Sequence, residues 1–100
     1  MGKSQIDIPT DKIAKFCLQN RIRRLSLFGS VLRSDFTPDS DVDVLIEFEP
    51  DTHVGLRFFD LELELSEIIG RKVDLNTPGF ISAYFRDEVL AMAEVQYDAA

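Results

Sequence analysis

The chain has 100 residues, of which 45% are hydrophobic and 29% are charged, and its net charge is −7. This length and hydrophobic content predict one folded domain over residues 1–100 and argue against a disordered chain. The negative charge argues against general nucleic-acid binding. No apolar run approaches the roughly 20 residues of a membrane-spanning helix, so we expect no membrane association either.

The first ten residues and the cysteine content predict a cytoplasmic protein. Residues 1–10 contain no apolar stretch of about seven residues or more, which a secretory signal would carry. Cys17 is the only cysteine, so an intrachain disulfide and a multi-cysteine zinc site are excluded.

The first half of the chain predicts a helix followed by two strands. A helix is expected to begin at Thr10, because apolar residues then recur at helical spacing as far as about residue 20. Residues 24–28 predict a short strand that stops at Gly29. Residues 42–48 predict the clearest strand, because every second residue from Val42 to Phe48 is apolar.

The second half predicts two further helices around a third strand. Residues 56–69 predict a helix that ends at Gly70, and residues 72–76 predict a short strand. A last helix is expected over about residues 80–92, with Ile81, Phe85, Val89 and Met92 as its buried stripe. The order α-β-β-α-β-α predicts an α/β or two-layer α+β fold, in which helices pack on a small mixed sheet.

Two groups of residues in this pattern leave alternatives open. Leu56, Phe59 and Leu63 form a second apolar stripe on the 56–69 helix, which either the last helix covers or a subunit interface uses. The basic cluster at residues 21, 23 and 24 either binds a phosphate or is a solvated helix end.

Asp41 and Asp43 are the first residues with clear chemical significance. They are two positions apart at the start of a strand, so both side chains are expected on the face opposite the apolar one. Two carboxylates about 4 Å apart repel by roughly 1 kcal/mol in water and about 4 kcal/mol at an effective dielectric of 20. A fold keeps such a pair where a cation offsets the repulsion or one carboxylate stays protonated.

Asp74 strengthens the first of these two explanations. It lies between Val73 and Leu75 in the third predicted strand, where apolar residues are usual. If that strand lies beside residues 42–48, Asp74 completes a site of three carboxylates. Oxygen ligands of this kind suit Mg²⁺, whereas a pair of aspartates alone is more often a solvated strand end.

Gly29 and Ser30 suggest how a phosphate could be held nearby. Glycine lets the backbone approach a phosphate closely, and the serine hydroxyl and free amides can donate hydrogen bonds to it. Arg33 could offer its planar guanidinium to a phosphate or could pair with Asp35. His53, in a polar loop, is expected at the surface.

These residues together carry a family resemblance. The pattern G-S-x-x-R-x-D-x-x-x-x-S-D-x-D over residues 29–43 resembles the nucleotidyltransferase superfamily that includes DNA polymerase β and kanamycin nucleotidyltransferase. It is most similar to the small stand-alone branch called minimal nucleotidyltransferases (MNT). Residues 69–75 also resemble the G-x-x-V-D-L element that carries the family's third carboxylate, so the resemblance covers about residues 10–93.

The resemblance implies a role for each of these positions and two cofactors, Mg²⁺ and ATP. Ser30 would bind the terminal phosphates of the nucleotide, with Gly29 permitting the approach. Asp41 and Asp43 would hold Mg²⁺, and Asp74 would ligate a metal and help to deprotonate the attacking hydroxyl. Members of this branch are commonly antitoxins paired with a helical HEPN-domain ribonuclease, which some inactivate by adding AMP to a tyrosine.

The size of the chain adds a constraint on the acceptor. Nothing remains for a second, acceptor-binding domain after the sheet and helices are built, and the charge of −7 favours a basic partner. Size and charge favour a protein acceptor, and the resemblance implies that this acceptor is a HEPN toxin. We therefore predict a protein adenylyltransferase and antitoxin that moves AMP from ATP to a tyrosine of the toxin, as a homo- or hetero-oligomer. The alternatives are a non-catalytic antitoxin that acts by binding only, and an antibiotic-modifying enzyme completed by homodimerisation.

Overall fold

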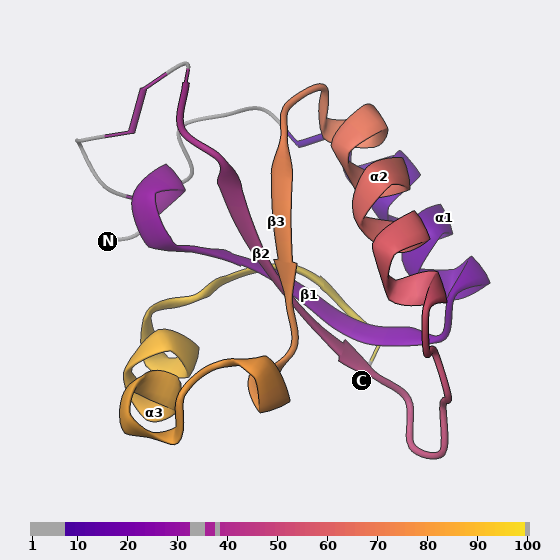
Figure 1. Ribbon diagram of the computed structural model, residues 1–100. Coiled ribbons are helices and arrows are strands. Elements are labelled where there is room, and N and C mark those ends of the chain that lie inside the picture. The colour runs from indigo at the N-terminus through magenta and orange to yellow at the C-terminus, as the bar shows by residue number, and fades with distance from the viewer. Residues whose placement is uncertain (1–7, 33–35, 38, 100) are drawn as a thin grey trace.

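A computed structural model describes residues 8–32, 36–37 and 39–99 of the chain (Figure 1). The elements follow one another as α1 (Thr10–Gln19), β1 (Ile22–Phe28), a 3₁₀ turn η1 (Gly29–Leu32), β2 (Val42–Phe48), α2 (Arg57–Ile69), β3 (Val73–Asn76), a 3₁₀ turn η2 (Pro78–Phe80), α3 (Ala83–Met92) and β4 (Glu94–Asp98). β2 has its predicted bounds, and α1, β1, α2 and β3 lie within about two residues of theirs.

The strands form one mixed sheet in the order β3-β2-β1-β4. β1 is antiparallel to both of its neighbours, whereas β2 and β3 run parallel. The predicted fold class, helices packed on a small mixed sheet, is therefore confirmed. None of the helices in the described ranges is long and apolar enough to cross a membrane.

The main core lies between the sheet and the two helices α1 and α2, which run side by side in Figure 1. Every second residue of β2 from Val42 to Ile46 is buried there. Phe16 of α1 and Leu65 of α2 are buried against them, and each such side chain contributes about 1.5–3 kcal/mol through loss of apolar surface. The apolar face of the sheet thus packs against the apolar faces of α1 and α2.

The end of α2 and the outer edge of β3 are joined by hydrogen bonds. Gly70 ends the helix with a φ of 80°, and its N–H donates to the carbonyl of Ser66. The N–H of Val73 donates to Ser66 Oγ (3.0 Å), and the N–H of Leu75 donates to Glu62 Oε2 (2.8 Å). Side chains of α2 therefore accept hydrogen bonds from backbone N–H groups along the edge of β3 that faces away from β2.

The C-terminal part of the chain differs from the prediction. The helix begins at Ala83 instead of about residue 80, and η2 precedes it. All residues of α3 are described and none is buried, so the predicted buried stripe is wrong. Phe85 and Met92 are exposed, and α3 leads into β4, a strand that the sequence pattern did not predict.

The second stripe of α2 stays exposed. The exposed fractions of Leu56, Phe59 and Leu63 are 83%, 62% and 66%. α3 lies well away from α2 in Figure 1 and covers none of these side chains. Of the two explanations, cover by the last helix is therefore wrong.

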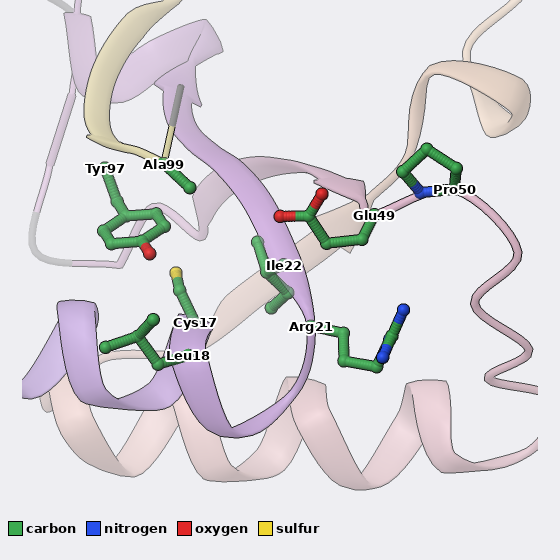
Figure 2. Close-up of a pocket in the computed structure, with 8 residues that line it drawn as sticks. All are labelled: Cys17, Leu18, Arg21, Ile22, Glu49, Pro50, Tyr97 and Ala99. Atoms are coloured by element: carbon green, nitrogen blue, oxygen red, sulfur yellow. The ribbon is translucent and has the colours of Figure 1, made fainter.

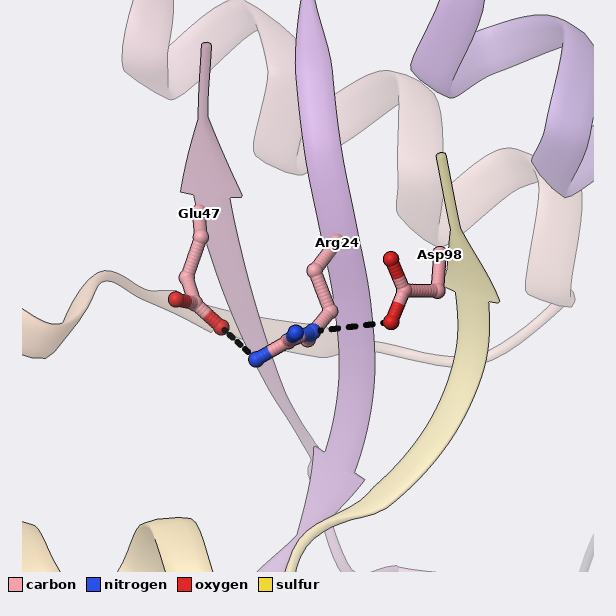
Figure 3. Close-up of polar contacts among 3 residues, drawn as sticks. All are labelled: Arg24, Glu47 and Asp98. Atoms are coloured by element: carbon pink, nitrogen blue, oxygen red, sulfur yellow. Dashed lines mark hydrogen bonds and ion pairs between the residues drawn. The ribbon is translucent and has the colours of Figure 1, made fainter. Parts of the chain in front are cut away.

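The three arginines of the basic cluster do not share one role. Arg21, just after α1, and Arg23 are exposed, as expected for a solvated helix end, whereas Arg24 is ion-paired. Figure 3 shows Arg24, on the central strand β1, between a carboxylate from each neighbouring strand. Its Nη1 lies 3.4 Å from Glu47 Oε2 on β2, and its Nε lies 3.3 Å from Asp98 Oδ2 on β4. Arg24 thus links three strands. Arg21 lies between α1 and β1 with a φ of 57°.

Candidate active site

Asp43 and Asp74 lie directly opposite each other on adjacent parallel strands. The register of β2 and β3 pairs Val42 with Val73 and Asp43 with Asp74. The valines are buried in the core under α1 and α2, so the two aspartates emerge on the other face of the sheet. The strand that carries Asp74 therefore lies beside residues 42–48, as the predicted site required, and Asp43 and Asp74 are on the same face of the sheet.

Gly29 fits closely against Asp43. β1 and β2 pair Phe28 with Asp43, and the chain turns at Gly29 with a φ of 74°. A Cβ atom at Gly29 would overlap Asp43 Oδ2 and would lie 3.1 Å from its Cγ. Only a residue without a side chain allows both this backbone conformation and this approach. Ser30 follows in η1 and is half-buried beside the same turn.

Asp41 directly precedes β2 and is more loosely held. Its Oδ2 lies 4.0 Å from Lys72 Nζ, and both side chains are largely exposed. Such a pair contributes little to stability in water. The backbone beside Asp41 is fixed more firmly, because the N–H of Val42 donates to the carbonyl of Lys72 (2.9 Å).

The donor set fits Mg²⁺ bound together with a nucleotide. Asp43 and Asp74 offer only oxygen ligands from neighbouring positions, and Mg²⁺ is usually bound by one or two carboxylates plus substrate phosphates and water. Within residues 8–32, 36–37 and 39–99, no three His, Cys, Asp or Glu side chains are arranged to hold a metal ion by themselves. Arg33, the remaining predicted phosphate ligand, lies outside the described residues.

Comparison with known proteins identifies the family. The sequence model of a family described as "nucleotidyltransferase domain" matches residues 10–94. The chain belongs to this nucleotidyltransferase family. The match extends from the start of α1 to the start of β4, and so includes Gly29, Asp43 and Asp74.

Relatives of this nucleotidyltransferase include proteins named as protein adenylyltransferases. MJ0128 of Methanocaldococcus jannaschii, provisionally so named, is 43% identical over 61 residues, which are 61% of each chain. Protein adenylyltransferase MntA of Thermococcus cleftensis is 41% identical over 54 residues, which are 54% of each. The match thus spans a little over half of the length of these relatives.

Solved structures share the fold of this nucleotidyltransferase. A provisionally named minimal nucleotidyltransferase has a TM-score of 0.70 and 30% identity, covering 84% of this chain and 85% of the other. A toxin–antitoxin structure with AMP-PNP has a TM-score of 0.73 and 22% identity, covering 91% and 74%. A chain in the structure of a tri-AMPylated Shewanella oneidensis HEPN toxin in complex with MNT antitoxin has a TM-score of 0.65 and 22% identity. The match covers 89% of this chain and 69% of the other. The latter two, at 22% identity, show the fold alone.

A shallow hollow of about 330 Å³ lies at the far end of the sheet from the carboxylates. Figure 2 shows its lining, which includes Ile22 at the start of β1 and Glu49 just after β2. Cys17 lies there too, and burial raises the pKa of its thiol to about 12. A thiol protonated at neutral pH is a poor nucleophile, which agrees with the place of Cys17 in the hydrophobic core.

His53, as predicted, lies exposed in a loop.

Arg71, which the sequence did not point to, contacts the backbone just before Asp41. Its Nη2 donates to the carbonyl oxygens of Thr37 (2.9 Å) and Ser40 (3.4 Å), in the turn that leads to Asp41. Its guanidinium carbon lies 4.6 Å from the ring centroid of Phe36. The only signal available was its place three residues before Asp74, and a single arginine there does not reveal which carbonyl groups it contacts.

Proposed function

We propose that this nucleotidyltransferase moves AMP from ATP to a hydroxyl of a partner protein in the cytoplasm. We further propose that Mg²⁺ is required, that the acceptor is a tyrosine of a HEPN ribonuclease toxin, and that the chain is its antitoxin. The observation that carries the proposal is the register of Asp43 with Asp74, with Gly29 packed against Asp43. The names of relatives support AMP transfer. The choice of ATP and of a HEPN partner follows proteins of the same fold, which include a toxin–antitoxin structure with AMP-PNP and a complex of a HEPN toxin with an MNT antitoxin.

The proposed reaction is an in-line displacement at the α-phosphorus of ATP. The acceptor oxygen forms a bond to that phosphorus, the bond to the oxygen bridging to the β-phosphate breaks, and pyrophosphate leaves. Asp74 would help to remove the hydroxyl proton, while Asp41 and Asp43 would hold the metal. When bound there, Mg²⁺ would neutralise charge on the phosphate oxygens.

The remaining groups would position the nucleotide. Ser30 can donate a hydrogen bond to the terminal phosphates, because the turn at Gly29 brings the backbone close to Asp43. Arg33 is a candidate for a second phosphate contact. Their contribution would be to hold charges and reacting atoms in place before the bond forms, the main task of the protein in such transfers.

The acceptor hydroxyl of the proposed reaction belongs to a separate partner protein. Asp43 and Asp74 lie on the face of the sheet away from α1 and α2, and Asp41 and Asp74 are exposed, so the proposed carboxylates are open to such a partner. The net charge of −7 favours approach of a basic protein over a nucleic acid.

Radiolabelled ATP tests this proposal directly. The purified chain, Mg²⁺, ATP labelled at the α-phosphate and the HEPN protein encoded beside it should yield a labelled toxin, with the label on a tyrosine by mass spectrometry. Asp43→Asn should abolish the label, whereas Asp51→Asn, in an exposed loop, should leave it unchanged. A folded, complexed pair that transfers no label would contradict the proposal.

A binding-only antitoxin is the second candidate, and the exposed stripe of α2 favours it. Leu56, Phe59 and Leu63 offer an apolar surface without any role in catalysis. The double variant Asp41→Asn/Asp43→Asn separates the two candidates: full protection of cells from the toxin indicates binding alone, and loss of protection indicates catalysis. An antibiotic-modifying homodimer would instead show twice the chain mass in solution without a partner.

A further inference from the structure

Arg71 connects the two strands that carry the proposed catalytic carboxylates. It lies between Gly70, which ends α2, and β3, which carries Asp74. Its side chain reaches the turn before β2, where it donates to the carbonyls of Thr37 and Ser40. These contacts join segments more than 30 residues apart in the sequence.

The turn that Arg71 contacts has further internal hydrogen bonds. The N–H of Ser40 donates to the carbonyl of Thr37 (3.0 Å), and the N–H of Thr37 donates to Ser40 Oγ (3.0 Å). The guanidinium also lies against the ring of Phe36, at a distance typical of a cation–π contact. One planar group thus holds three residues of the turn.

The backbone groups on either side of Asp41 are hydrogen-bonded to Arg71 and Lys72, the two residues just before β3. The preceding carbonyl, of Ser40, accepts from Arg71, and the following N–H, of Val42, donates to Lys72. The backbone of Asp41 is therefore fixed from both sides, although its own carboxylate is exposed and only weakly paired. Asp43 follows two residues later, in β2, which begins at Val42.

We propose that Arg71 is a positioning residue, which holds Asp41 and Asp43 at a fixed place relative to Asp74. The proposal rests on the function proposed above for these carboxylates. A planar guanidinium suits the task because it can stack on Phe36 while its N–H groups donate in the same plane. Residues that orient metal-binding side chains typically change affinity or activity 10–100-fold when they are removed.

Two measurements that need no acceptor test the role of Arg71. Without the contacts of Arg71 the turn should open more often, so the N–H groups of Thr37 and Ser40, which donate within the turn, should exchange about tenfold faster in the Arg71→Ala variant. Exchange in α1 should not change. Calorimetry with Mg²⁺ and AMP-PNP should show affinity weakened by about tenfold or more. With an acceptor, kcat should fall while the KM for the acceptor stays constant.

Two further variants control the experiment. Arg57→Ala removes the arginine at the start of α2, whose Nη2 donates to Asn20 Oδ1 (3.1 Å). This variant should bind AMP-PNP as tightly as the wild type, because Arg57 lies at the opposite end of α2 from Arg71. Arg71→Lys keeps the charge and the aliphatic stem if the alanine variant fails to fold, and should show the same changes to a smaller degree. Unchanged exchange, or faster exchange with unchanged AMP-PNP affinity, would overturn the proposal. A wild-type chain that binds no AMP-PNP would contradict the proposed function itself.

Discussion

Asp43 and Asp74 are directly paired across the parallel ladder of β2 and β3. Like charges at directly opposed positions destabilise a sheet by a few tenths of a kcal/mol up to about 1 kcal/mol. The fold therefore keeps a mildly unfavourable pair beside a glycine that leaves room for one of the carboxylates. The proposed binding of a cation with a nucleotide would account for this arrangement, and it gives the first prediction.

Asp74→Asn should separate stability from activity. Removing one charge relieves the repulsion, so the free energy of unfolding without Mg²⁺ should stay the same or rise by about 0.5 kcal/mol. AMP transfer should fall at least about 100-fold, because several kcal/mol of charge stabilisation are lost. Urea denaturation and a transfer assay measure the two effects. A variant that is both less stable and fully active would contradict the role given to Asp74.

Gly29→Ala should harm both the turn and the site. An L-residue at a φ of 74° costs about 1–2 kcal/mol, and the new Cβ would also displace the carboxylate of Asp43. Gly70→Ala is a matched control, since Gly70 has a φ of 80° but nothing within 4 Å of an added Cβ. Thermal unfolding should show a smaller loss for Gly70→Ala, and only Gly29→Ala should lose transfer activity. Equal effects of the two variants would argue against the close fit at Asp43.

Glu62→Ala should destabilise the edge of β3. The N–H of Leu75 would lose its carboxylate acceptor on α2, at a cost of about 1–3 kcal/mol. Glu64→Ala, on the exposed side of the same helix, should change the free energy of unfolding by no more than about 0.5 kcal/mol. Urea denaturation of the two variants provides the comparison, and similar values for both would contradict the proposed capping.

Cys17 should be protected from alkylation in the folded chain. Its thiol pKa is raised from 9.0 to about 12 by burial, so very little thiolate exists at pH 8. Iodoacetamide should react slowly with the native protein and quickly in urea. Because the folded pKa is higher than the unfolded one, this group's contribution to stability is fully present below pH 9 and is lost as pH rises towards about 12. Rapid native alkylation at pH 8 would contradict this.

Much of the fold was predictable because its signals are local. Val42 to Phe48 alternates apolar and other residues, and α1 and α2 show helical periodicity, so each element could be recognised from its own segment. The fold class and the nucleotidyltransferase family were predicted correctly for the same reason. The helix α3 was also predicted, but its exposure was not. The strand β4 was not predicted, because it depends on pairing with β1, which lies about 70 residues earlier.

The sequence by itself determined the chemistry, whereas the tertiary structure decided where that chemistry is assembled. Residue identity alone specifies three carboxylates and a Gly-Ser turn that suit a cation and a phosphate. Only the folded sheet places Asp74 opposite Asp43, brings Gly29 against that carboxylate, and directs Arg71 to the turn before Asp41. Strand register and long-range hydrogen bonds depend on contacts between distant segments, and such contacts leave no pattern within any one segment.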